Sequence, residues 1–166
     1  WGQGAKATAL SYGATNILFK GEEFGYVVDL NPEQIPLTHQ EFFRKQVKYY
    51  IDDKNRLFVH GGFNRHLELK NHMNYVFYWD RSLWLGAVGA KAGNLPYKTV
   101  QQFEHIYIGH TTTLNFGTDK PMTLFNITNL DTGAGYRGRL TLINVDTNEV
   151  FQSDLAQELY PNEEGR

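Results

Sequence analysis

The residues of this chain best suited to chemistry are two histidines, each placed where a β-type stretch ends. His60 follows Phe58-Val59 and precedes two glycines, and His110 follows Ile106-Tyr107-Ile108-Gly109 and precedes three threonines. A short strand holds the side chain at its end with little freedom, and glycine lets a ligand approach the backbone. Imidazole is a common ligand of divalent metals, and a bound metal can activate water. The pair therefore predicts a metal site of hydrolytic type, unless each histidine is simply packed or hydrogen-bonded.

The elements expected to position these histidines combine helices and strands. Helices are predicted over residues 5–12, 38–50 and 75–85, and strands over 56–60, 105–110, 123–127, 139–145 and 149–152. The second helix opens on Thr38-His39-Gln40-Glu41, which predicts a capping box with Thr38 as its N-cap. Because strands dominate the second half, the predicted class is α+β (α/β layered), with a mainly antiparallel C-terminal sheet.

The remaining segments are expected to be loops. Residues 65–74, with His66 and His72, are predicted to be exposed, and residues 87–98 form a segment of small residues that also includes a loop. Helical spacing or strand neighbours predict core packing for most of four aromatic side chains: Phe42, Phe43, Tyr49 and Trp79.

The composition is that of an ordinary globular protein, and it excludes several classes. With 166 residues, 41% of them hydrophobic, and a net charge of -2, the chain is expected to form one domain and not to bind nucleic acid. No apolar run is long enough to cross a membrane and no signal-peptide pattern is seen, so a cytoplasmic location is expected. The absence of cysteine removes disulfides and thiolate chemistry.

Several motifs, in this order, resemble the calcineurin-like metallophosphoesterases: Phe58-Val59-His60-Gly61-Gly62, Trp79-Asp80-Arg81, Gly109-His110-Thr111 and Asp131-Thr132-Gly133-Ala134. Residues 1–8 with 11–13, and residues 136–141, are also similar to segments of that family. The branch that the chain resembles most is that of the bacterial serine/threonine protein phosphatases and dinucleoside tetraphosphatases. The resemblance extends over residues 1–152, and residues 153–166 are expected to be a polar tail.

The resemblance implies the C-terminal half of a β-sandwich flanked by helices, with metal-dependent phosphoester hydrolysis as the activity. Such enzymes hold two divalent metals, which activate water and stabilise the phosphoryl oxygens. By resemblance, His60 and His110 are ligands of the second metal, and Arg81 contacts the substrate phosphate, which a planar guanidinium suits. The metal implied is manganese, with iron, zinc or nickel as alternatives. The implied substrate is a phosphorylated protein or a small phosphoester.

Three motifs of the family are absent from these 166 residues: Gly-Asp-x-His-Gly, Gly-Asp-x-x-Asp-Arg-Gly and Gly-Asn-His-Asp/Glu. In the family they supply the first metal's ligands, the bridging aspartate, the asparagine ligand and the histidine that protonates the leaving group. The chain is therefore expected to be the C-terminal part of a phosphatase and to be inactive alone. It is also expected to self-associate through surface that the missing half would cover.

Two other functions stay open on the sequence. A dinucleoside polyphosphate hydrolase would differ from a protein phosphatase in the loops of its substrate pocket, expected at 64–75 and 83–97. A degenerate, non-catalytic domain would instead use its aromatic residues to bind a glycan or a protein partner. Histidine-dependent metal binding separates this last possibility from the two enzymes.

Overall fold

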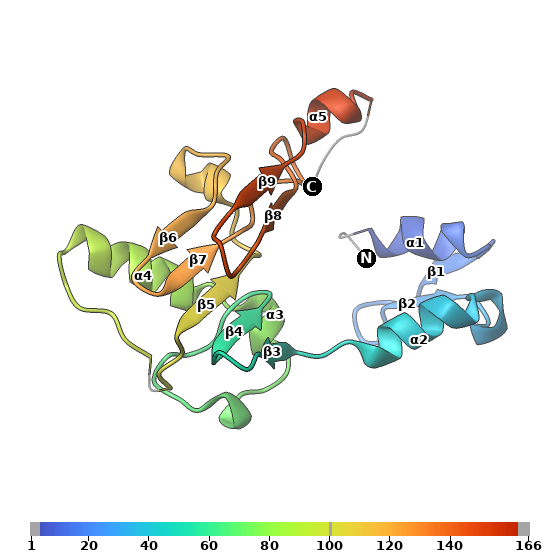
Figure 1. The fold of residues 1–166 in the computed structure, drawn as a ribbon. Helices are drawn as coiled ribbons and strands as arrows, with labels where there is room; N and C mark the ends of the chain where they lie inside the picture. Colours follow the sequence, from blue (N-terminus) through green and yellow to red (C-terminus); the bar gives the residue numbers. More distant parts are fainter. Residues whose placement is uncertain (1–3, 100, 163–166) are drawn as a thin grey trace. The chain divides into compact units, whose positions relative to one another are not determined.

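Both helices and mixed sheets are present in the computed structural model, which describes residues 4–99 and 101–162, so the predicted α+β class is confirmed. The chain divides into two compact units, with the boundary between Gln46 and Val47 (Figure 1). None of the helices within the described ranges has the length and hydrophobicity that crossing a membrane requires.

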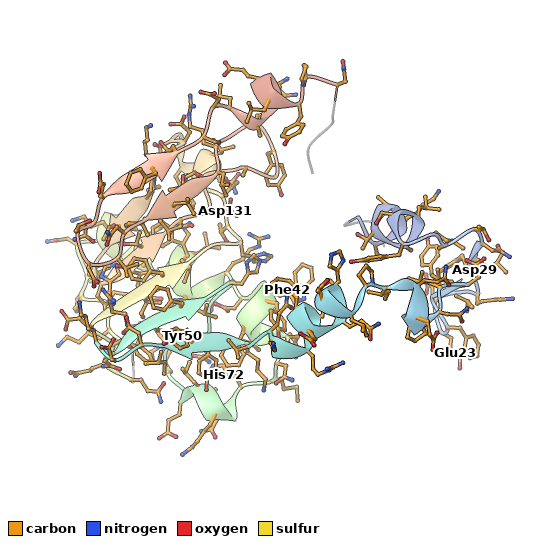
Figure 2. All side chains as sticks on the ribbon, turned by 45° about the vertical axis from the view of Figure 1, so that its right-hand side comes forward. Glu23, Asp29, Phe42, Tyr50, His72 and Asp131 are labelled. Atoms are coloured by element: carbon orange, nitrogen blue, oxygen red, sulfur yellow. The ribbon has the colours of Figure 1, made fainter. Side chains whose placement is uncertain are left out.

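The N-terminal unit contains two helices, a hairpin and a 3-10 turn. In chain order these are α1 (Ala5–Ser11), β1 (Ile17–Phe19), β2 (Tyr26–Val28), η1 (Pro32–Gln34) and α2 (Leu37–Lys45). The predicted first helix is confirmed as α1, whereas the antiparallel β1–β2 hairpin has no counterpart among the predicted strands. Asp29, labelled in Figure 2, closes this hairpin by accepting hydrogen bonds from the backbone N–H groups of Thr15 and Asn16 at 2.9 and 3.0 Å.

The predicted helix over 38–50 is wrong at both ends. Helix α2 begins one residue earlier, with Pro36 at the N-cap position, so Thr38 lies inside the helix and forms no side-chain cap. It ends at Lys45, because Tyr49–Ile51 forms strand β3 and pairs antiparallel with the next strand. Two tyrosines and an isoleucine suit a pleated strand, and pairing with a neighbouring strand overrides their helical spacing.

The second unit is built on a five-stranded sheet with strand order β3-β4-β5-β7-β6. The strands added to β3 are β4 (Arg56–Val59), β5 (His105–Ile108), β6 (Met122–Leu124) and β7 (Ile127–Asn129). The three central strands, β4, β5 and β7, run parallel, and antiparallel pairing is confined to the edge strands β3 and β6. The expected mainly antiparallel sheet is therefore corrected at its centre. Parallel pairing follows from the long connection after β4, which carries helices.

The predicted C-terminal hairpin is confirmed, and the predicted strand before it is corrected. Strands β8 (Thr141–Ile143) and β9 (Val150–Gln152) pair antiparallel as a separate sheet. The expected single strand over 123–127 is divided between the end of β6 and the start of β7, with a turn between them where Phe125 has a left-handed backbone with a φ of 55°. A short helix, α5 (Ala156–Leu159), lies in the segment expected to be a polar tail.

The predicted helix over 75–85 is two helices, α3 (Val76–Trp79) and α4 (Ser82–Ala92), with a break at Asp80. Asp80 has an extended backbone, and its carboxylate accepts hydrogen bonds from the backbone N–H of Leu83 at 3.1 Å and from the Ser82 hydroxyl at 2.6 Å. These bonds satisfy donors that the first turn of a helix leaves open, so the break begins a new helix. Helix α4 then continues through the first half of the segment of small residues expected over 87–98.

Small residues in α4 let an aromatic side chain pack closely against the helix. The Tyr97 hydroxyl donates a hydrogen bond to the Leu83 carbonyl at 2.7 Å, and a Cβ on Gly86 would lie only 2.6 Å from that hydroxyl. The α4 side chains Leu83, Trp84 and Ala87 are buried in one core with the apolar residues of β4, β5 and β7. This core fixes the central strands, and with them the residues at the strand ends.

The expected core packing of aromatic residues holds for Tyr49 alone. Its ring is half-buried and lies 5.0 Å from that of Phe77, a core residue. Phe42, Phe43 and Trp79 are 63%, 54% and 51% exposed, so their predicted burial is wrong. Helical spacing identified a common face, but α2 in its own unit has no buried residue.

Candidate functional site

The two histidines predicted from the sequence lie side by side at the carboxyl ends of the central parallel strands of the five-stranded sheet. Strands β4 and β5 are parallel neighbours, with Phe58 opposite Tyr107, so their carboxyl ends meet at the same edge. His60 follows β4 directly, and the N–H of Gly109 continues the pairing by donating to the His60 carbonyl at 2.8 Å. The imidazole centroids of His60 and His110 are 5.1 Å apart, with their planes at 55°.

His110 is held in an unusual backbone conformation by contacts on both sides. Its φ is 63°, in the left-handed region that residues with a Cβ rarely adopt. Its ring packs edge-to-face on Trp79, with centroids 5.4 Å apart. Arg81 Nη1 donates to the His110 carbonyl at 2.8 Å and to the Thr111 hydroxyl at 2.9 Å. The Trp79-Asp80-Arg81 motif, at the junction between α3 and α4, therefore fixes the backbone and the ring of His110.

The loop after His110 is held by its own buried threonines and by a hydrogen bond from the end of strand β7. Thr111, Thr112 and Thr113 are all buried, and the side-chain amide of Asn129, at the end of β7, donates to the Thr111 carbonyl at 2.7 Å. The Thr112 hydroxyl accepts a hydrogen bond from the Leu114 N–H and caps the 3-10 helix η3 (Thr113–Phe116). The three buried threonines thus form a rigid support for His110.

The environment of His110 favours its neutral form. Burial lowers the pKa of the His110 imidazole, and the positive charges of Arg81 and His60 lower it further. Asp131 and a backbone hydrogen bond with Trp79 act in the opposite direction without reversing the shift. The Nε2 atom of His110 is buried and has no hydrogen-bond partner among the described residues. A neutral imidazole with an unpartnered ring nitrogen has the chemistry of a metal ligand.

A small cavity of about 260 Å³ brings both histidines together with a carboxylate, that of Asp131. A Cβ on Gly109 would lie 3.9 Å from His60 Nδ1 and 3.8 Å from the Cβ of Asp131, so glycine keeps this space open. Asp131, labelled in Figure 2, follows β7 as His110 follows β5, and these two strands are parallel neighbours. Asp131 is not among the predicted site residues, because the predicted strand ends at Ile127, too early to place Asp131 beside the histidines.

The donor set around the two imidazoles is partial. Within residues 4–99 and 101–162, no group of three or more histidine, cysteine, aspartate or glutamate side chains is placed to hold a metal ion. His60 and His110 fit two positions of a coordination shell, and the remaining donors would have to come from elsewhere.

Arg81 also faces a much larger cleft of about 1090 Å³, which we call the arginine cleft. It is lined by Arg81, His110, Thr111, Asn115, Tyr136 and Arg137 among others, and within residues 4–99 and 101–162 no aspartate or glutamate lines it. Nη1 is the one guanidinium nitrogen of Arg81 with a hydrogen-bond partner in the described structure. The rest of the group is available to an anion, and a planar fork suits two phosphate oxygens.

The segments expected to form the substrate pocket line a different cavity. A space of about 420 Å³ is bordered by residues of both 64–75 and 83–97, but by neither His60, His110 nor Arg81. Of the two histidines on the first segment, His66 is exposed as predicted.

His72, by contrast, is half-buried, which corrects its expected exposure. Its Nε2 accepts a hydrogen bond from the Asn64 N–H at 3.0 Å, and its ring packs on Phe63 and Phe77. These contacts give His72 a structural role.

No model of a known protein family matches the chain, and no curated protein is significantly similar to it.

Proposed function

We propose that the protein to which this chain belongs hydrolyses phosphoesters in a metal-dependent reaction, as the calcineurin-like metallophosphoesterases do. The observation that carries the proposal is the pair of imidazoles 5.1 Å apart, with the guanidinium of Arg81 bonded to the carbonyl of one of them. Ligands for a metal and a donor for phosphate oxygens thus meet at one sheet edge. A domain that bound a glycan or a protein through aromatic residues would not need this arrangement.

Each residue has a distinct part in the proposed reaction. His60 and His110 would hold a metal through their ring nitrogens, and Arg81 would bind oxygens of the phosphoryl group. The lowered pKa of His110 keeps its ring deprotonated near neutral pH, so that no proton has to leave before a ligand bond forms. Trp79 fixes the orientation of that ring. When bound, divalent metals would supply the Lewis acid and the activated water that phosphoester hydrolysis needs.

The chain alone is expected to bind zinc or nickel weakly and to be inactive. Two imidazoles without a full set of carboxylates suit these metals better than manganese or magnesium, which prefer oxygen ligands. Without a bridging carboxylate, no group of the described residues would position the attacking water. We propose phosphorylated protein side chains as the substrate of the parent protein, with manganese as its metal.

Calorimetric titration of the purified chain with zinc tests the metal site. We expect weak binding that His60→Gln and His110→Asn each abolish, because each removes one of two ligands. His66→Gln is the matched control, because His66 is an exposed histidine outside the site. Loss of zinc binding in the His66 variant, or its retention in either site variant, contradicts the assignment.

Two further measurements test the reaction. The purified chain with manganese should not hydrolyse an aryl phosphate, and turnover would show that the missing motifs are not needed. The reading frame before the Trp1 codon should encode the three missing motifs. A stop codon or an unrelated sequence there would contradict the proposed activity and favour a non-catalytic domain.

A further inference from the structure

The arginine cleft has a charge distribution that favours anions. Two arginines line it, from the start of α4 and from the loop between Thr132 and Gly138, and the other lining residues within the described ranges include no carboxylate. Its volume of about 1090 Å³ is that of a site for a drug-sized ligand and is far larger than a single phosphate group needs. The cleft therefore has room for a second chemical group beside the one that Arg81 would bind.

No carboxylate of the described residues neutralises the charge of Arg137, in contrast to the charges of Arg139 and Arg56. Arg139, two residues later, donates to the Asp119 carboxylate at 2.9 Å, and Arg56 is bonded to Asp52 and Asp146. Arg137 is exposed in the cleft, and no residue of the described ranges forms a hydrogen bond or an ion pair with it. An arginine that is exposed in a cleft and has no partner among the described residues is available to a ligand.

The loop that carries Arg137 is anchored at both ends, so the backbone that presents the arginine is held in place. The N–H of Gly138 donates to the Gly133 carbonyl at 2.9 Å, and the Gly138 carbonyl accepts from the N–H of Ala156 at 2.8 Å. The Thr132 hydroxyl donates to the Arg139 carbonyl at 2.6 Å. These bonds hold both ends of the loop, and the exposed Tyr136 and Arg137 lie at its tip.

We propose that the arginine cleft binds a ligand with two anionic groups, one held by Arg81 and the other by Arg137. Arg137 thereby sets specificity for substrates that carry a second negative charge near the reacting phosphate. The identity of the first anion as the reacting phosphate rests on the proposed function. Binding of the two anions does not rest on it, because neither arginine is expected to contact the metal.

Anion binding by the metal-free chain tests this inference, with tripolyphosphate and inorganic phosphate as probes. We expect tripolyphosphate to bind more tightly than phosphate at equal ionic strength. Arg137→Gln should weaken tripolyphosphate binding about fivefold to tenfold, the loss of a charge-assisted contact in an open cleft. The same variant should change phosphate binding by less than about twofold, because a single anion would bind at Arg81.

Arg44→Gln is the matched control, since Arg44 is an exposed arginine on α2 and its removal changes the net charge equally. Three results overturn the inference. These are equal weakening of both probes by Arg137→Gln, no weakening of either, or as much weakening of tripolyphosphate by Arg44→Gln. Zinc binding at His60 and His110 is measured separately, so a failure of the metal site does not affect this outcome.

A second pair of probes identifies the source of the second anion. Phosphoserine peptides with and without a neighbouring aspartate present the same chemistry on a polypeptide. If Arg137→Gln removes the preference for the acidic peptide, the second group belongs to a protein substrate. If it affects tripolyphosphate alone, the second group is another phosphate of a polyphosphate chain.

Discussion

Replacing Gly138 by alanine is expected to disrupt the loop that carries Arg137. A Cβ on Gly138 would overlap the Thr132 carbonyl oxygen deeply and would lie 2.8 Å from the Thr132 carbonyl carbon. Both are backbone atoms, and the oxygen is held in place because it accepts a hydrogen bond from the Arg139 N–H at 3.1 Å. No flexible side chain can move aside, so the backbone itself would have to shift.

The loss of stability expected for Gly138→Ala depends on which atoms around the added methyl group can move aside. Overpacking that side chains can absorb costs about 1–3 kcal/mol. For Gly138→Ala we expect about 3 kcal/mol or more, because the hydrogen bonds at the base of the loop would have to stretch or break. Gly135→Ala is the matched control in the same loop, since no atom lies within 4 Å of the added methyl group. Its stability should stay within about 0.5 kcal/mol of the wild type.

Urea unfolding followed by tryptophan fluorescence measures the difference. Trp84 is fully buried in the core of the same unit, so its emission reports the loss of that unit's packing. The midpoints of the two variants are compared at equal slopes, which converts them into a difference in the free energy of unfolding. If Gly138→Ala unfolds within about 0.5 kcal/mol of Gly135→Ala, the loop is not anchored as described.

The pH dependence of stability and the packing of the sheet give two further tests. Because the pKa of His110 is lowered in the folded protein by burial, Arg81 and His60, its contribution to stability is complete above the unfolded pKa of about 6.5 and is lost as the pH falls through the lower folded value. His110→Asn should therefore flatten the unfolding free energy between about pH 8 and pH 5, and an unchanged profile in denaturant titrations refutes this. Leu57→Ala should cost about 2–5 kcal/mol, because Leu57 is fully buried, while Leu142→Ala at an exposed strand position should cost less than about 0.5 kcal/mol; equal losses in urea unfolding would contradict the packing described.

The histidine pair could be predicted because its determinants are local. His60 and His110 each follow a short β-branched and aromatic run, and glycine next to each marks where the run stops. The sequence did not reveal that the two strands are adjacent and parallel, which brings the rings together. That property depends on how the intervening helices return the chain to the sheet.

The errors in element boundaries have three separate causes. Tyr49 and its neighbours read as the end of a helix, but they pair with β4 as an edge strand. The break at Asp80 depends on a carboxylate that bonds to the next helix instead of extending the previous one. Asp131 was not predicted as a site residue because the chain turns at Phe125, so that the strand before it ends at Asn129, two residues later than expected. Strand pairing, one side-chain hydrogen bond and one turn therefore decide where these elements end, against the spacing of apolar residues along the chain.

At position 110 the left-handed backbone favours glycine for stability, whereas the proposed metal site requires histidine. A residue with a Cβ carries a cost of about 1–2 kcal/mol in that conformation, whereas glycine carries none. Variants selected for stability alone should therefore accumulate glycine at position 110, and variants selected for the activity of the parent protein should keep histidine. A mutational library at position 110, screened once for stability and once for activity, would measure the loss of stability that accompanies the imidazole.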